Sequence, residues 1–337
     1  MKKIVLLILT LSLVLTAGCA KKEDTAKEDT KPVVKEKSVE NEFVKKISTD
    51  TRPLAVMIDN DGPSSRPQIG LEDAYLVYEV IVEGGATRLM ALFKDTSIEK
   101  VGPIRSSRHY FLDYALENDA LYVHAGWSPK ATTDISLLEV NNINGILGSD
   151  ASIFYRDNTY DSTYHNLYSS VAKAYEFAEK KKKYYTTSDI EYTWYSNEDF
   201  DLTDGVGANE FTVPYSTLYT VNYKYNSDTK LYERYIGSTP HVSQTTDILT
   251  AKNIIICHVK NYPLNDGENK DRQEVETVGE GTGYYVTNGK AIEINWEKPE
   301  RTERTIYTDV NGNEITINPG NTYIQIVPMH SEITFSE

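Results

Sequence analysis

The sequence predicts an α+β protein, with an N-terminal mixed α/β domain whose central sheet is packed by helices and a β-rich C-terminal domain. Apolar strand-like runs alternate with helix-like segments between residues 51 and 195. Short alternating strands separated by turns dominate residues 209–337. The segment between them, residues 191–208, is polar and frequent in Asn, Asp and Gly. We therefore expect two folded domains, residues 51–195 and 209–337.

The first 18 residues have the layout of a lipoprotein signal peptide. Two lysines precede an apolar run from Ile4 to Leu15, which is too short to span a bilayer, and small residues lead to Cys19. The closing sequence LTAGC resembles a bacterial lipobox, with Leu15 one place earlier than usual. This resemblance implies cleavage before Cys19 and attachment of a diacylglycerol to its sulfur. The alternative is a plain secreted protein.

Residues 19–50 alternate Lys with Glu and Asp and contain few apolar side chains. Such a segment cannot bury enough surface to fold alone, so we expect a flexible tether. The signal peptide, the anchor and the tether together predict a protein held by lipid on the extracytoplasmic face of the cell membrane.

The part expected to fold is strongly acidic. Residues 53–337 carry 42 acidic and 24 basic side chains, a net formal charge of −18. This charge repels a phosphate backbone, so no nucleic-acid partner is expected. Once Cys19 is lipidated, Cys257 has no partner for a disulfide, and its apolar surroundings predict a buried, unreactive thiol.

Strands come first in the N-terminal domain. Residues 52–60 form a short apolar strand that runs into a loop dense in turn residues. Residues 73–94 contain two strand-like runs joined at a pair of glycines, which is the pattern of a β-hairpin. Glu79 and Glu83 share one face of the first run by two-residue periodicity.

An amphipathic helix is expected over residues 104–117. Its apolar stripe at helical spacing comprises Ile104, Phe111, Leu112 and Ala115. Arg105 and Arg108 are i, i+3 neighbours near its start, and His109 and Asp113 are i, i+4 neighbours. We expect this helix to pack on the sheet.

Further elements follow along the chain. Residues 120–125 predict a strand, and residues 132–140 and 168–182 predict helices. In the C-terminal domain, the glycine-rich segment 279–284 (GEGTGY) lacks the ending of a phosphate-binding loop. It predicts instead a turn or bulge where two backbones approach.

Several segments resemble the YerB-like family of bacterial lipoproteins, which carries paired DUF3048 regions. The most specific are EGGATR at residues 83–88 and GPIRSSR at residues 102–108; others are RPLAVMIDN, YVHAGWSP, VGEGTGYYVTNGKAIEINW and NPGNTYIQIVP. Together they cover most of the chain from Arg52 onward. The resemblance implies a lipid-anchored protein outside the cytoplasmic membrane with a two-part α+β fold. It implies no reaction, cofactor or catalytic residues.

Two arginines near a helix start are electrostatically unfavourable, because that end of a helix favours negative charge. Together with Arg88, Arg105 and Arg108 are therefore candidates for a pocket that binds a phosphate, a carboxylate or an anionic glycan. The alternative is internal pairing with acidic side chains of the same domain, namely Glu79, Glu83 or Asp73. We predict a ligand-binding cleft lined by Arg88, Arg105, Arg108, His109, His124, His165 and Asn166.

No catalytic residue, metal site or cofactor is predicted. The histidines lack the spacing of a zinc site, even with Asp113 or Asp59 as a further ligand. No GxSxG motif accompanies the serines near them. Cys257 and His258 are adjacent in a strand and so point to opposite faces, which makes them a poor catalytic pair.

The leading hypothesis is a non-enzymatic binding or accessory protein of the cell envelope, whose partner is an anionic envelope component or another protein. One alternative is a cell-envelope hydrolase or transferase that acts on phosphorylated or anionic glycans. It would use the arginines as a phosphate clamp and His109 or His165 as acid or base. Another is a structural adaptor that binds partners through tyrosine-rich sheet surfaces.

Overall fold

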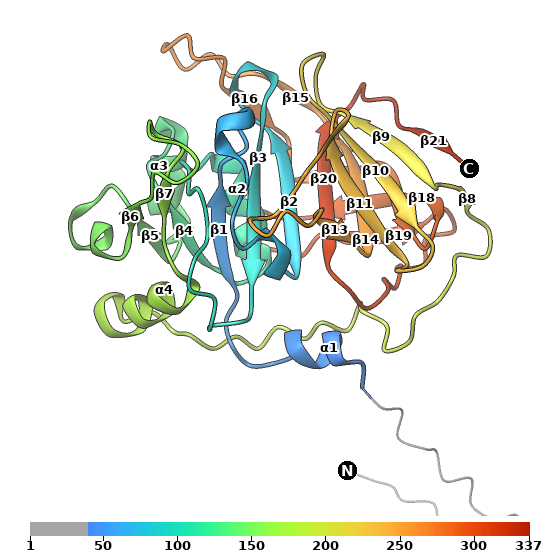
Figure 1. Ribbon diagram of the computed structural model, residues 1–337, viewed down its shortest axis with the longest axis horizontal. Coiled ribbons are helices and arrows are strands. Elements are labelled where there is room, and N and C mark those ends of the chain that lie inside the picture. The colour runs from blue at the N-terminus through green and yellow to red at the C-terminus, as the bar shows by residue number, and fades with distance from the viewer. Residues whose placement is uncertain (1–39) are drawn as a thin grey trace, which may run out of the picture. The chain divides into compact units, whose positions relative to one another are not determined.

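An eleven-stranded mixed sheet is the largest element of the computed structural model, which describes residues 40–337 (Figure 1). Its strands are β1 Leu54–Ile58, β2 Leu76–Ile81, β3 Thr87–Phe93, β4 Leu121–His124, β5 Asn142–Asn144, β8 Val206–Gly207, β14 Asn253–Val259, β17 Gly279–Thr287, β18 Lys290–Lys298, β19 Ile306–Asp309 and β20 Thr322–Pro328. Their spatial order is β19-β18-β17-β14-β20-β2-β3-β1-β4-β5, and β8 pairs with β18. The predicted α+β class is confirmed.

Strands from both halves of the sequence meet in this sheet. Strand β2 pairs in parallel with β20, from Leu76 opposite Thr322 to Val80 opposite Ile326. Strands β1, β2 and β20 are buried along their whole length, because both faces of the sheet are covered there. The two ranges expected as domains therefore share one sheet, and residues 40–337 lie within one compact unit.

A second, six-stranded antiparallel sheet comes from the C-terminal half and lies on the right of Figure 1, where its strands are yellow and orange except for the red β21. Its strands are β9 Glu210–Pro214, β10 Thr220–Asn226, β11 Leu231–Ile236, β12 Thr239–Pro240, β13 Thr250–Ala251 and β21 Thr334–Ser336. Val221 and Tyr223 are buried while Lys224 is exposed, the alternation of a sheet with one covered face. Two small hairpins complete the strands, β6 Tyr155–Arg156 with β7 Leu167–Tyr168, and β15 Asn261–Pro263 with β16 Gln273–Val275.

The helices are short. The α-helices are α1 Glu42–Ile47, α2 His109–Glu117, α3 Pro129–Leu137 and α4 Val171–Phe177, which continues as a π-turn over Ala178–Lys182. The 3₁₀ turns are η1 Pro63–Ser65, η2 Leu71–Asp73, η3 Glu83–Gly85 and η4 Gly148–Ile153. Ser128 and Ser170 cap α3 and α4, because each hydroxyl accepts a hydrogen bond from a backbone N–H of the first turn. None of the helices in residues 40–337 is long and apolar enough to cross a membrane.

The predicted hairpin of residues 73–94 is confirmed as β2 and β3, joined through η3. The predicted start of the next helix is wrong, because α2 begins at His109 and Arg108 has extended backbone angles. Residues 104–107 lie instead along the ends of two strands. Arg105 N donates to Met57 O at 3.0 Å, and Ala125 N donates to Arg105 O at 3.0 Å. These hydrogen bonds to neighbouring strands satisfy the backbone groups that a helical turn would otherwise use.

The glycine-rich segment 279–284 was expected as a turn or bulge, but it is the first part of strand β17. The expected close approach of backbones is present, since a β-carbon at Gly283 would collide with the carbonyl of Ile256 on β14. The Cys257 thiol on β14 is buried as predicted, and burial raises its pKa.

The predicted signal peptide and Cys19 lie outside the described residues, as does the predicted tether up to residue 39. The last part of this predicted tether is not flexible as expected, because residues 42–47 form α1. Val44 and Ile47 of α1 are buried, and the Phe43 ring packs on Tyr195 with centroids 5.3 Å apart. These apolar contacts stabilise a helix too short to form alone.

Candidate functional site

A buried carboxylate organises the carboxyl end of β1. Asp59 follows this strand and is 0% exposed. Its Oδ2 forms an ion pair with Arg105 Nε at 2.8 Å and lies 2.7 Å from His165 Nδ1. The carboxylate thereby orients the imidazole with Nδ1 toward Asp59. Within residues 40–337 nothing hydrogen-bonds the other ring nitrogen, Nε2.

Arg105 contacts Asp59 through only one of its three side-chain nitrogens, Nε. Its side chain is 23% exposed, and its guanidinium carbon lies 5.2 Å from the centre of the exposed Tyr164 ring. The terminal Nη1 and Nη2 groups donate no hydrogen bond to any part of the chain that the structure describes. They are therefore positioned to donate to a ligand.

Arg88 lies next to this pair on β3 and is only 6% exposed. Its Nη1 donates to the Ser106 carbonyl at 2.6 Å, and its buried Nε has no hydrogen-bond partner. No carboxylate among residues 40–337 lies within ion-pair distance of it. Burial and the nearby Arg108 charge lower its pKa to about 10, so the side chain still carries its positive charge at neutral pH.

Arg108 precedes α2 and is paired inside the fold. Its Nε donates to Glu83 Oε1 at 2.5 Å, and its Nη1 donates to the Ser107 carbonyl at 2.7 Å. Burial opposes ionisation of Glu83, but the hydrogen bond from Arg108 lowers the pKa of this carboxyl. The internal pairing with Glu83 that we considered for the arginines is thus present for Arg108.

We call Asp59, Glu83, Arg88, Arg105, Arg108 and His165 the arginine cluster. Apart from His165, it contains three guanidinium groups and two carboxylates, so one positive charge has no direct counterpart. A buried charge without a partner is costly. The cluster is therefore the part of the predicted site most suited to accept an anion.

In residues 40–337, the remaining side chains of the predicted cleft make no hydrogen bond or ion pair with the arginine cluster. His124 is fully buried; its Nδ1 lies 2.8 Å from the Gly126 carbonyl and its Nε2 3.2 Å from Asn142 Oδ1. Burial lowers the pKa of His124. Asn166 accepts a hydrogen bond from Arg156 and donates one to Asn158. Both side chains hold local structure together.

His109 lines a different, polar hollow of about 310 Å³. Its Nε2 lies 2.9 Å from Glu274 Oε1, and Glu274 Oε2 lies 2.6 Å from Lys130. Burial lowers the pKa of His109 despite this carboxylate. Arg301 bridges Asp113 at 2.6 Å and Asp134 at 2.9 Å in the same hollow. The charged groups of this hollow thus form ion pairs with one another.

Residues of the C-terminal half pair with the charged side chains around α2, and they were not among the predicted site residues. Glu274 and Arg301 have no local motif, and only the fold brings them to α2. In the part of the chain that the structure describes, no group of three or more His, Cys, Asp or Glu side chains is arranged to hold a metal ion.

These features define an α+β protein in which two sheets pack together. The arginine cluster, whose positive charge exceeds the negative charge of its own carboxylates, lies at the carboxyl end of β1 in the larger sheet. Two family models match the chain: "Protein of unknown function (DUF3048) N-terminal domain" at residues 41–186, and the corresponding C-terminal domain at residues 211–324. The chain belongs to this family and is YerB-like, as its resemblance predicted.

A relative from Bacillus subtilis (strain 168) carries the name "Putative lipoprotein YerB". It is 32% identical over 295 residues, which cover 83% of this chain and 82% of the relative. The crystal structure of YerB from Bacillus subtilis matches with a TM-score of 0.71 at 26% identity. That match covers 85% of this chain and 95% of the solved chain. The family, the fold and a relationship to a protein named as a lipoprotein are therefore established.

Proposed function

We propose that this chain is a non-enzymatic binding or accessory lipoprotein of the cell envelope that binds an anionic group at the arginine cluster. A lipid on Cys19 would hold it on the extracytoplasmic face of the membrane. The LTAGC sequence and the name of the relative from Bacillus subtilis support this anchoring.

One observation carries the ligand proposal: Arg88 is buried and charged without a carboxylate in contact. A bound phosphate or carboxylate would supply the missing negative charge. It would also accept hydrogen bonds from the free Nη groups of Arg105, and such charge-assisted bonds are among the strongest in proteins. A long polyanion is disfavoured because residues 53–337 have a net charge of −18. The ligand is therefore a single anionic group on a larger envelope molecule.

Binding of N-acetylglucosamine 6-phosphate, an envelope-type sugar that carries a single phosphate group, tests this function. Arg105→Ala removes the open donors but leaves Arg88 and Arg108 in place, and a hydrogen bond to a charged group contributes about 1.5–3 kcal/mol. We expect the variant to bind at least about tenfold more weakly than the wild type. Arg304→Ala, which removes an exposed arginine paired with Glu314, is the matched control and should bind like the wild type. Equal binding by all three proteins would refute the arginine cluster as the site.

The Asp59–His165 pair favours one second function, an envelope enzyme acting on phosphorylated glycans. A carboxylate on Nδ1 and an open Nε2 is the arrangement in which histidine acts as a general base or acid. Incubation of the protein with phosphorylated glycans distinguishes the two functions. Product release that is lost in His165→Gln, while binding persists, would establish the enzyme. Binding without turnover supports the accessory protein.

A further inference from the structure

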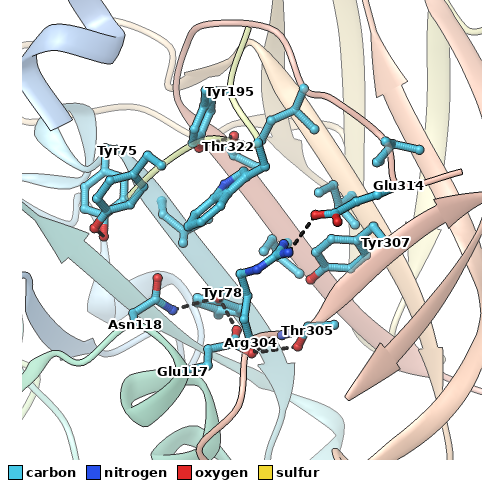
Figure 2. Close-up of a pocket in the computed structure, with 17 residues that line it drawn as sticks. Tyr75, Tyr78, Glu117, Asn118, Tyr195, Arg304, Thr305, Tyr307, Glu314 and Thr322 are labelled. Atoms are coloured by element: carbon cyan, nitrogen blue, oxygen red, sulfur yellow. Dashed lines mark hydrogen bonds and ion pairs between the residues drawn. The ribbon is translucent and has the colours of Figure 1, made fainter. Parts of the chain in front are cut away.

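Figure 2 shows a slot lined by aromatic side chains. It lies at the start of β2, whereas Glu83 of the arginine cluster follows the end of this strand. Its aromatic walls are Tyr75, Tyr78, Tyr192, Trp194, Tyr195 and Tyr307. Only about 50 Å³ of the hollow is free for groups the size of water. As it stands the slot has room for a few water molecules and none for a ring-sized ligand.

The chain's own Arg304 takes up the centre of the slot. Figure 2 shows this side chain reaching across it to Glu314, beside the Tyr307 ring. Arg304 Nη2 lies 2.6 Å from Glu314 Oε1, and the guanidinium carbon lies 5.0 Å from the centre of the Trp194 ring. A cation over an indole face next to a carboxylate is a favourable arrangement. The slot therefore already has the chemistry that accommodates a guanidinium group.

The walls of the slot are held firmly, whereas Arg304 is not. At the base, the Glu117 carboxylate accepts hydrogen bonds from Tyr78 at 2.5 Å and Lys298 at 2.7 Å. In contrast, the side chains of Arg304 and Glu314 are 37% and 48% exposed, and exposed ion pairs are weak. Arg304 can leave at low cost, and Glu314 is then a carboxylate with no cation opposite it.

We propose that this slot binds the guanidinium group of an arginine side chain presented by a partner protein. The incoming group displaces the side chain of Arg304, which occupies the slot in the unbound protein. The incoming group repeats both contacts of Arg304, over the Trp194 indole and to the Glu314 carboxylate. The net charge of −18 on residues 53–337 favours a cationic partner as well. This site is separate from the arginine cluster, so it does not depend on the function proposed above.

The test uses the full-length lipoprotein in detergent and three probes, argininamide, citrullinamide and N-acetylglucosamine. Citrullinamide has nearly the same shape as argininamide but an uncharged urea group. Binding is followed by tryptophan fluorescence in the wild type, Arg304→Ala and Arg304→Ser. Circular dichroism verifies that each variant is folded.

Arg304→Ala and Arg304→Ser are expected to bind argininamide up to about fivefold more tightly than the wild type, because the competing internal group is gone. Adding Glu314→Gln to Arg304→Ala should remove most of that gain, and citrullinamide should bind poorly to every protein. Arg156→Ala, a control at an exposed arginine that donates to the Asn166 amide and so frees no carboxylate, should leave argininamide binding unchanged. The proposal is overturned if the folded variants bind no argininamide, bind citrullinamide equally well, or bind only N-acetylglucosamine, which would make the slot a sugar site.

Discussion

Oε2 of Glu79 and Nη2 of Arg234 lie 2.6 Å apart, and neither side chain is exposed to solvent. Glu79 lies on β2 of the large sheet and Arg234 on β11 of the second sheet, so this ion pair joins the two sheets. Glu79 Oε1 also accepts hydrogen bonds from Thr87 Oγ1 at 2.7 Å and from Tyr219 at 2.9 Å. The contact between the sheets thus depends on a polar network that excludes water.

Glu79→Ala is expected to destabilise the fold by about 3–5 kcal/mol, because it leaves the Arg234 charge buried without a partner. Urea unfolding followed by circular dichroism measures this loss. Arg304→Ala breaks an exposed ion pair and should cost no more than about 1 kcal/mol. Similar costs for the two substitutions would show that the buried pair is not critical for stability.

His241 should make the protein less stable in mild acid. The Arg234 guanidinium donates to its Nδ1, and its Nε2 lies 2.6 Å from Gln68 Oε1, so the ring is held in its neutral form. Burial, and then the charges of Arg234 and Arg66, lower its pKa well below the usual 6.5. The unfolded chain therefore takes up this proton first, and stability falls as the pH drops below about 6.5.

A proton that binds His241 only in the unfolded chain lowers the free energy of unfolding by up to about 1.4 kcal/mol for each pH unit below about 6.5. His241→Gln keeps one acceptor and one donor but cannot titrate, so its stability should decline less between pH 6.5 and 5. Urea unfolding across this pH range measures the slope. An unchanged slope in His241→Gln would mean that this ring is protonated in the folded protein.

The proposed lipid anchor should hold the protein in the membrane fraction of the cell. Cys19→Ala removes the sulfur that would carry the diacylglycerol, and the apolar run before it is too short to span a bilayer. We expect the wild type in the membrane fraction and the variant largely released from it. Fractionation and immunoblotting measure the two pools. Equal retention of both proteins in the membrane fraction would contradict anchoring through Cys19.

Local patterns in the sequence predicted the elements that local interactions determine. The β2–β3 hairpin follows from two strand-like runs around paired glycines, and α3 and α4 follow from helical spacing. The start of α2 was missed because residues 104–107 bond to strands that are distant in sequence. An amphipathic pattern cannot show which backbone groups find partners elsewhere.

The site was predictable only where its contacts stay within the N-terminal half. Arg108 and Glu83 are 25 residues apart, and their pairing was one of the two alternatives considered. His109 was placed in the same cleft as the arginines, yet it meets Glu274, which is 165 residues away. Glu79 likewise pairs with Arg234 across 155 residues. Only the packing of the two halves determines these partners.

The arginine cluster has one positive charge more than its own acids neutralise, and we propose that an anion completes it. Arg88→Met removes that charge and keeps most of the side-chain volume, so the fold should be retained. Isothermal titration with inorganic phosphate measures whether the cluster binds an anion. We expect heat of binding for the wild type and for Arg304→Ala, and none for folded Arg88→Met. Equal phosphate binding by Arg88→Met, or no binding by the wild type, would contradict this proposal.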